Sequence, residues 1–395
     1  MLTKSPSAPD LAQALVAFVR EQYQTEDFIP LHAPTLGPAE ARAVAEAVES
    51  GMISTVGAQV GVFEAQLAEF TGAAHVIATI NGTAALHLGL LGVGLEPGEE
   101  VLTQALTFVA TASAIRYCNA EPVFLDVDRA TMGLSPDAVA AFLNTHADRD
   151  DSGAVINKTT RRRIRACLPM HTNGHVGEIT RLAEICDAWG LALVEDAAEA
   201  LGSWRDGLHA GRTGRCGTLS FNGNKIISTG QGGAVMTDDV DLAARIRHLA
   251  ATAKQPHPWR YVHDEVGYNY RLPALNAALG TAQLTRLPEF LNNKRALAQA
   301  YITWFDSRGL TPVREPDGAS SNYWFNAFLA DGLTARDTVL EVTNAQGVMT
   351  RPLWDLLQTL PAYRNHHAAD LSNSQWLYER LVNVPSSPVM WEVTE

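Results

Sequence analysis

The sequence has few cysteines and little positive charge, and both shortages narrow the classes of protein it can encode. Only four cysteines occur in 395 residues, and none forms a CxxC pair. This pattern argues against a disulfide framework or a zinc site and favours reduced thiols in a cytoplasmic protein. With 43 acidic against 30 basic residues, the formal net charge is −13. We therefore expect no nucleic-acid partner, no association with an anionic membrane and no bound metal.

Long apolar runs and a dinucleotide fingerprint are also missing. No uninterrupted apolar stretch is long enough to span a bilayer, because the most apolar region, residues 75–95, contains a polar Asn-Gly pair. Apolar residues at helical spacing near the N-terminus predict an amphipathic helical arm over residues 1–28 rather than a signal peptide. No GxGxxG segment follows a strand pattern, which argues against a nicotinamide-dependent oxidoreductase.

What the sequence does contain is a regular alternation of short apolar stretches and helical patterns. Strands are predicted at residues 75–80, 100–104, 122–127, 164–170 and 191–196, with helices between them. This order predicts an α/β fold, a mostly parallel sheet between helices. The regular alternation of strand and helix patterns stops after residue 238. We therefore predict a large domain over 29–274 and a smaller C-terminal α+β domain over 275–395. The charged segment 148–165 is expected to be a solvated loop.

Three polar features fall at the carboxyl ends of predicted strands, where an open parallel sheet binds ligands. The first is NGTAAL (81–86), in which Gly82 permits a tight turn and Thr83 opens a helix. Backbone N–H groups at a helix start, with a threonine hydroxyl beside them, suit a phosphate group. An ordinary turn with Thr83 as the helix cap would explain the same residues.

The second feature is the pair Glu195-Asp196 at the end of an apolar strand, followed by Glu199. Strand alternation sends the first two side chains to opposite faces of the sheet. A buried carboxylate requires a positive partner, and a protonated pyridine nitrogen is one such partner. The alternative is structural: Asp196 caps a helix and Glu199 completes a capping box.

The third feature is LSFNGNKIISTGQGG (219–233), where Lys225 lies between a short strand and a glycine-rich turn, with Ser220 and Asn222 before it. The alternative is a β-hairpin with an exposed lysine. A phosphate site, a buried acid and a lysine at one sheet edge together match the needs of pyridoxal 5′-phosphate (PLP). The lysine would form a Schiff base with the cofactor, and the acid would hold the proton of the pyridine nitrogen.

The sequence also resembles the DegT/DnrJ-type sugar aminotransferases, which have the fold of aspartate aminotransferase, fold type I. The resemblance runs from about residue 28 to 388 and is specific because many motifs match together. These motifs are NGTAAL (81–86), LTFVATA (106–112), VEDAAEALGS (194–203), LSFNGNK (219–225), GGAVMTDD (232–239), GYNYRLPALNAALG (267–280) and TRPLW (350–354).

The resemblance implies a role for individual residues of this chain. Lys225 is the lysine bound to the cofactor, and Asp196 pairs with the pyridinium nitrogen. The other implied cofactor contacts are Gly82, Thr83 and Ser220 at the phosphate, Phe108 stacked on the ring, Glu199 near the phenolic oxygen, and Asn222. Asn222 stands where many family members have histidine.

The resemblance also implies a homodimer with shared active sites, in which Asn269 reaches the phosphate of the neighbouring subunit's cofactor. Predicted substrate contacts are His171, Tyr323 and Arg351. For Arg351, a pairing with a diphosphate or a donor carboxylate is one interpretation, and a structural salt bridge is the alternative. Asn173, close to His171, stands where many family members have an aromatic residue.

Within the family the chain looks most like enzymes of bacillosamine and legionaminic acid synthesis. The supporting segments are residues 28–37, 252–259, 263–271 and 320–327. This likeness implies transfer of an amino group from L-glutamate to the C4 ketone of a UDP-linked 2-acetamido-4-keto-6-deoxy sugar. The alternatives are a GDP- or dTDP-linked keto-deoxy sugar as acceptor, or a non-catalytic regulatory protein with the same fold.

Overall fold

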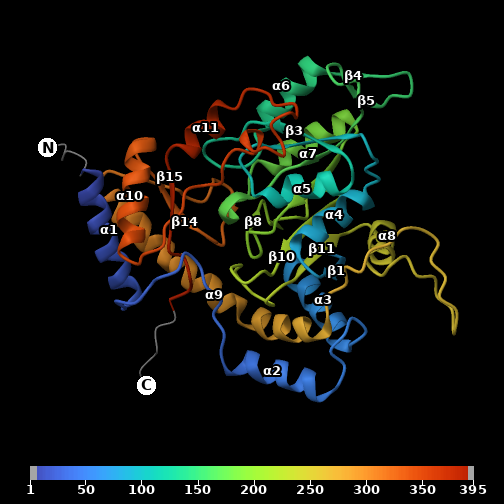
Figure 1. Cartoon of the computed structure of the whole chain (residues 1–395), viewed down its shortest axis with the longest axis horizontal. Coiled ribbons are helices and arrows are strands. Elements are labelled where there is room, and N and C mark those ends of the chain that lie inside the picture. The colour runs from blue at the N-terminus through green and yellow to red at the C-terminus, as the bar shows by residue number, and fades with distance from the viewer. Residues whose placement is uncertain (1–6, 390–395) are drawn as a thin grey trace.

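A seven-stranded sheet forms the centre of the computed structural model, which describes residues 7–389 (Figure 1). The strand order is β1-β11-β10-β7-β6-β2-β3. Strands β10, β7, β6, β2 and β3 run parallel, whereas β11 is antiparallel to both of its neighbours. The strands are β1 (His75–Thr79), β2 (Glu100–Gln104), β3 (Glu121–Leu125), β6 (Ile164–Leu168), β7 (Ala192–Asp196), β10 (Cys216–Ser220) and β11 (Gly233–Thr237). The prediction of a mostly parallel sheet is confirmed.

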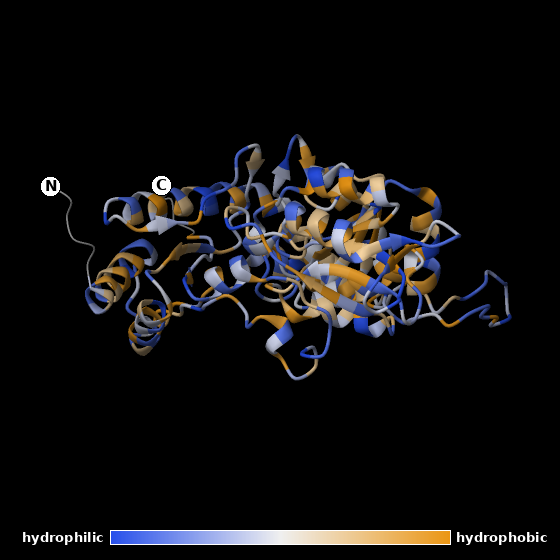
Figure 2. Cartoon of the chain, turned by 90° about the horizontal axis from the view of Figure 1, so that it is seen from above, coloured by the Kyte–Doolittle hydropathy of each residue, from blue (hydrophilic) through white to orange (hydrophobic). Residues whose placement is uncertain are grey.

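Helices cover both faces of this sheet, so its strands are apolar on both sides. Along β1, Val76 and Ala78 join one apolar cluster and Ile77 joins another on the opposite face. Figure 2 shows the resulting concentration of hydrophobic residues in the central strands. The helices are α2 (Pro38–Glu49), α3 (Ala58–Thr71), α4 (Gly82–Gly92), α5 (Val109–Tyr117), α6 (Pro136–His146), α7 (Ile179–Trp189) and α8 (Val240–Ala250).

A smaller unit is built around the three-stranded sheet β12-β14-β15, at the side of the molecule where α1 and α10 lie (Figure 1). The predicted N-terminal helix is present as α1, and its Leu15 and Val19 share an apolar cluster with Val339 of α10. The elements here are α1 (Ala8–Tyr23), α9 (Ala274–Asp306), β12 (Thr311–Pro312), β14 (Asn326–Leu329), α10 (Leu333–Ala345), α11 (Ser372–Tyr378) and β15 (Leu381–Val384).

The long helix α9 belongs to both units. Its Leu284 and Leu287 lie in the core of the large sheet, whereas Tyr301 and Phe305 lie in the cluster beneath α1. Packing therefore changes within α9, and the limits at residues 28, 274 and 395 remain sequence-based predictions. None of the helices among residues 7–389 is long and apolar enough to cross a membrane.

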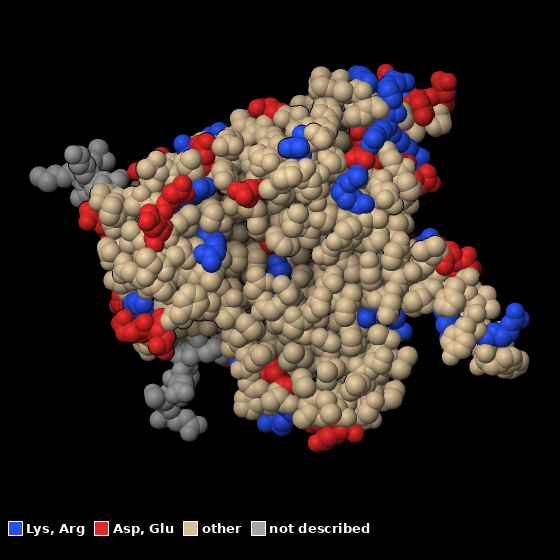
Figure 3. All heavy atoms as spheres, in the orientation of Figure 1, with Lys and Arg blue, Asp and Glu red and all other residues tan. Residues whose placement is uncertain are grey.

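The segment predicted to be a solvated loop contains a short hairpin, β4 (Ala147–Arg149) paired with β5 (Val155–Asn157). Some of its basic residues form ion pairs: Arg162 lies 3.0 Å from Glu121, and Arg165 lies 2.9 Å from Glu99. Figure 3 shows basic and acidic side chains together in this region. Three further two-residue strands form the sheet β13-β8-β9: β8 (Trp204–Arg205), β9 (Leu208–His209) and β13 (Ala319–Ser320).

Candidate active site

A cavity of about 680 Å³ lies where the carboxyl ends of the central strands meet the smaller unit. The large unit lines it with the start of α4, the end of β7 and the connection from β10 to β11, and the smaller unit adds residues such as Trp324. The structure thereby brings most of the predicted site residues together. Those in the lining are Gly82, Thr83, Phe108, Asp196, Glu199, Ser220, Asn222, Lys225 and Arg351.

Lys225 lies in an irregular turn between β10 and β11, where its backbone N–H donates to the carbonyl of Asn222 at 3.0 Å. Its Nζ lies 3.3 Å from Oε1 of Glu199 and 3.9 Å from the ring centroid of Trp324. The strands β10 and β11 do form a hairpin, but the lysine side chain is only 12% exposed. The alternative of an exposed hairpin lysine is therefore wrong.

Asp196 ends β7 with its carboxylate buried. One oxygen accepts from the hydroxyl of Thr111 at 2.8 Å, and the other accepts from the N–H of Ala198 at 3.2 Å. Burial raises the pKa of Asp196, with the Thr111 hydrogen bond acting in the opposite direction. A cation placed against this carboxylate would compensate for its burial. No helix follows, since residues 198–199 form a turn, so the capping-box alternative is wrong.

Glu199 is also buried and links three parts of the site. Its Oε1 accepts from Lys225, and its Oε2 accepts from the backbone N–H of Asn173 at 2.9 Å. Burial raises the pKa of Glu199 to about 7, although the charge of Lys225 opposes the shift. A carboxyl with this pKa exchanges a proton near neutral pH, next to the lysine amine.

The start of α4 forms a narrow recess with Ser220. Asn81, rather than Thr83, caps this helix, because the Asn81 side chain accepts from the N–H of Ala84 at 2.8 Å. A Cβ atom on Gly82 would lie 2.9 Å from Cβ of Ser220, so only glycine fits at this point. Helix N–H groups and a serine hydroxyl around such a recess fit a phosphate group.

Phe108 and Asn222 contribute exposed side chains to the cavity wall. Phe108 immediately precedes α5 and is 46% exposed, with its ring 6.1 Å from that of Trp354. An exposed aromatic face inside a cavity is suited to stacking on a planar ligand. The lysine, the buried acid, the phosphate recess and this ring thus fit pyridoxal phosphate.

His171 and Tyr323 are not among the residues that line this cavity, and their contact with substrate stays a prediction. Nε2 of His171 lies 2.9 Å from Oε2 of Glu195, and both side chains are buried. Glu195 does face away from Asp196, as alternation predicts. The hydroxyl of Tyr323 accepts from the backbone N–H of Glu315, and its ring packs edge-on against His175. Both residues already have partners within the protein.

Asn269 is exposed on the segment between α8 and α9, which projects from the body of the molecule (Figure 1). A single chain does not bring this residue into the cavity. A prediction that Asn269 acts on a neighbouring subunit is compatible with this position and remains a prediction.

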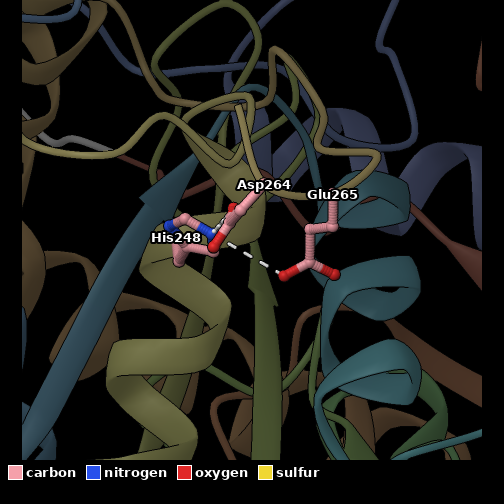
Figure 4. A group of neighbouring side chains, drawn as sticks. All are labelled: His248, Asp264 and Glu265. Atoms are coloured by element: carbon pink, nitrogen blue, oxygen red, sulfur yellow. Dashed lines mark hydrogen bonds and ion pairs between the residues drawn. The ribbon is translucent and has the colours of Figure 1, made fainter. Parts of the chain in front are cut away.

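Side chains at the base of this segment form a charged group with α8 (Figure 4). Ligand atoms of His248, Asp264 and Glu265 lie within 4.8 Å of one another. His248 lies 2.7 Å from Asp264, and Arg245 donates to both oxygens of Glu265. Because the guanidinium of Arg245 already binds both carboxylate oxygens of Glu265, we interpret the group as ion pairs that fix the segment to α8.

Several lining residues were not predicted from the sequence. They come from the smaller unit or the chain before α2, and they are Leu31, Trp324, Phe325, Trp354, Asp355 and Asn383. The segment SSNYWFNA (320–327) contains Trp324 and Phe325, and its two adjacent large aromatic residues are the signal that could have indicated them. Asn173 donates to Asn383 at 2.7 Å, and both amide side chains are buried.

The fold and the site define a fold type I, PLP-dependent aminotransferase. The chain belongs to the DegT/DnrJ/EryC1/StrS aminotransferase family, whose model matches residues 34–394. It is therefore a sugar aminotransferase that uses pyridoxal phosphate.

Individual relatives cover nearly the whole chain. GDP-perosamine synthase of Caulobacter vibrioides is 34% identical over 91% of this chain and 93% of its own length. The aminotransferase TlmJ of Streptoalloteichus hindustanus is 32% identical, with a TM-score of 0.83 over 92% of this chain and 95% of that one. DesI, solved with its TDP-sugar product, is 29% identical, with a TM-score of 0.80 over 94% and 91% of the two chains.

These relatives change the prediction for the acceptor. GDP-perosamine synthases of Vibrio cholerae and Escherichia coli O157:H7 also match, at 31% and 33% identity. The UDP-linked acetamido sugar predicted from the sequence receives no support from them. A nucleotide-sugar aminotransferase is supported, and the GDP-linked alternative fits better.

Proposed function

We propose that the protein transfers the amino group of L-glutamate to the ketone of a GDP-linked keto-deoxy sugar. The observation that carries the chemistry is the cavity in which Lys225, Asp196 and the start of α4 converge. The matches to GDP-perosamine synthases over nine-tenths of the chain support the choice of nucleotide.

Each residue of the site has a separate task in this reaction. Pyridoxal phosphate supplies an aldehyde that accepts the amino group and a ring that stabilises negative charge on the reacting carbon. Lys225 would hold the cofactor, and its Nζ would move a proton on the substrate. Asp196 keeps the ring nitrogen protonated, and Glu199 exchanges a proton beside Nζ. Ser220 and the N–H groups of α4 hold the phosphate.

A panel of nucleotide-linked keto sugars tests the acceptor. Glutamate would be supplied with the GDP- and dTDP-linked 4-keto-6-deoxy sugars and with the UDP-linked 2-acetamido-4-keto-6-deoxy sugar. Product NMR would identify the amine and its configuration. We expect the highest kcat/KM with the GDP-linked sugar. A clear preference for the UDP- or dTDP-linked compound would overturn the choice of nucleotide but leave the aminotransferase chemistry intact.

We also propose that the protein works as a homodimer with shared sites. The segment between α8 and α9 exposes large apolar side chains, with Trp259 79%, Tyr261 81% and Val266 80% exposed. Exposed apolar residues of this size on a projecting segment favour burial against another protein surface. A second copy of this chain is the partner that would also bring Asn269 to a cofactor phosphate.

A non-catalytic regulatory protein with the same fold is the competing function. Retention of both Lys225 and Asp196 in the cavity disfavours it. A purified protein that is yellow and bleaches on addition of glutamate would identify the enzyme, whereas a colourless or unreactive protein would support the competitor. A cytoplasmic location, favoured by four buried free cysteines, is part of the proposal.

A further inference from the structure

Trp324 is held by contacts along its whole length. Its backbone N–H donates to Oδ1 of Asn322 at 2.7 Å, and its carbonyl accepts from Nζ of the buried Lys294 at 3.2 Å. The Trp324 ring stacks on the Phe325 ring with 3.7 Å between their centroids. Residue Trp324 as a whole is only 3% exposed. These contacts leave the indole one orientation against the cavity.

The indole contacts the segment that carries the cofactor lysine at two points. Its Nε1–H donates at 2.7 Å to the carbonyl of Asn224, the residue immediately before Lys225. Its face lies 3.9 Å from Nζ of Lys225, and Oε1 of Glu199 lies 3.3 Å from the same Nζ. The amine is therefore enclosed by an aromatic face and a carboxylate, both of which attract an ammonium group.

The position of Lys225 explains why such support is needed. The residue lies beyond β10 in an irregular turn, so no strand or helix fixes the direction of its side chain. A long lysine side chain without a partner has many rotamers. The hydrogen bond from the indole to Asn224 fixes the backbone next to Lys225, and the ring face fixes the far end of the lysine side chain.

We propose that Trp324 is a positioning residue for Lys225, holding the amine beside Glu199 whenever the lysine is not bonded to the cofactor. The inference rests on the proposed role of Lys225 as the cofactor lysine. Trp324 would thus define the place to which the amine returns in each half-reaction. It takes no part in bond making itself.

The test measures the reactivity of Lys225 in the cofactor-free protein. Wild type, Trp324→Phe and Trp324→Leu would be labelled with acetic anhydride at fixed pH, and acetylation of Lys225 would be quantified by peptide mass spectrometry. An amine held in one place between a ring face and a carboxylate is less free to meet the reagent, so loss of the face should increase labelling. We expect a rise of about tenfold for leucine and a smaller rise for phenylalanine, which keeps a face but loses the bond to Asn224.

Trp354→Leu is the matched control, because Trp354 lines the same cavity and the substitution removes the same volume. We expect less than about a twofold change in Lys225 labelling in this variant. An equal rise in Trp354→Leu and Trp324→Leu would mean that access alone governs labelling and would overturn the proposal. Wild-type labelling in both Trp324 variants would also overturn it. If the leucine variant does not fold, Trp324→Phe decides in the same way.

A separate arm distinguishes this inference from the proposed function. Wild-type protein loaded with pyridoxal phosphate would be reduced with borohydride, and the cofactor-bearing peptide would be mapped. Attachment at a residue other than Lys225 would refute the assigned role of Lys225 and the inference with it. Attachment at Lys225 with unchanged labelling in the Trp324 variants would refute only the positioning role.

Discussion

At the scale of single residues, the site depends on two buried carboxyl groups with different surroundings. Asp196 accepts hydrogen bonds from Thr111 and Ala198, whereas Glu199 lies against Lys225. Burial raises the pKa of both, and only the second has a lysine at hydrogen-bond distance. The two acids are thus suited to different tasks, one at the cofactor ring and one at the reacting amine.

Asp196→Asn should reduce the reaction rate more than it reduces cofactor content. Asparagine keeps an acceptor for Thr111, so the fold and the phosphate recess are retained, but it cannot hold a proton on the ring nitrogen. We expect kcat to fall by about a hundredfold or more, with cofactor occupancy near that of wild type. Single-turnover rates and cofactor absorbance measure the two quantities. Unchanged rates would mean that Asp196 has only a structural role.

Glu199 should make the stability of the cofactor-free protein depend on pH. Burial raises the pKa of the Glu199 carboxyl from 4.5 to about 7, so the folded state binds this proton more tightly than the unfolded state does. Its contribution is fully present below pH 4.5 and is lost as the pH rises through about 7. Between pH 5 and pH 8, wild type should lose about 2–3 kcal/mol more free energy of unfolding than Glu199→Gln. Urea titrations at both pH values test this, and equal losses would contradict it.

At the scale of secondary-structure elements, the closest fit in the site is between α4 and the end of β10. Gly82→Ala would place a methyl group 2.9 Å from Cβ of Ser220. The helix start must then move away from the serine, at a cost of about 1–3 kcal/mol. We expect the Kd for pyridoxal phosphate to rise by about tenfold or more, measured by absorbance titration of the apoprotein.

Gly61→Ala provides the control for that substitution. Gly61 is an exposed residue of α3, and no atom lies within 4 Å of an added Cβ. Alanine in a helix should stabilise the protein by up to about 1 kcal/mol without affecting cofactor binding. Equal cofactor affinity in the two variants would show that the recess beside Ser220 is not the phosphate site.

The elements differ in how far the sequence could predict them. Strand β2 was predicted at the residues where it occurs, because an apolar stretch between polar ends is a local signal. The two-residue strands β8, β9 and β13 have no periodicity to detect. Asp196 was predicted because it ends an apolar strand, and Lys225 because it lies shortly after another. Trp324 was not, because it reaches the lysine from a segment about a hundred residues further along the chain.

Two residues predicted to contact substrate, His171 and Tyr323, lie outside the cavity lining for a common physical reason. In the structure the His171 ring lies 2.9 Å from the carboxylate of Glu195, and the backbone N–H of Glu315 donates to the hydroxyl of Tyr323. Contacts of this kind depend on tertiary structure, which no spacing in the sequence expresses.

At the scale of the whole molecule, the proposed dimer predicts complementation between two inactive variants. Lys225→Ala and Asn269→Ala would damage the same site from different subunits. In a mixed dimer one site carries both lesions, and the other carries neither. Equal amounts refolded together should therefore recover roughly a quarter of wild-type activity, since about half the dimers are mixed and each has one intact site.

The experiment requires each variant to be deficient alone and subunit exchange to be demonstrated, for example with differently tagged chains. Refolded mixtures of each variant with itself are the controls. With exchange proven, an inactive mixture would contradict the shared site, because a site built from one chain would keep its own lesion in every dimer.

The reversed direction of β11 has a consequence for redesign of this scaffold. Because β10 and β11 are antiparallel neighbours, the connection that carries Lys225 has both ends clamped in the central sheet, at Ser220 and Gly233. If β11 ran parallel to β10, a long crossover would have to connect the two strands, and such a connection tolerates added residues more easily. An insertion between those two residues therefore acts on a short connection anchored at both ends, beside the lysine. The segment before α9 is no freer, because its Arg271 bridges Thr79 of β1 and because it carries Asn269. Loop grafting that aims at new acceptors should therefore leave both connections untouched.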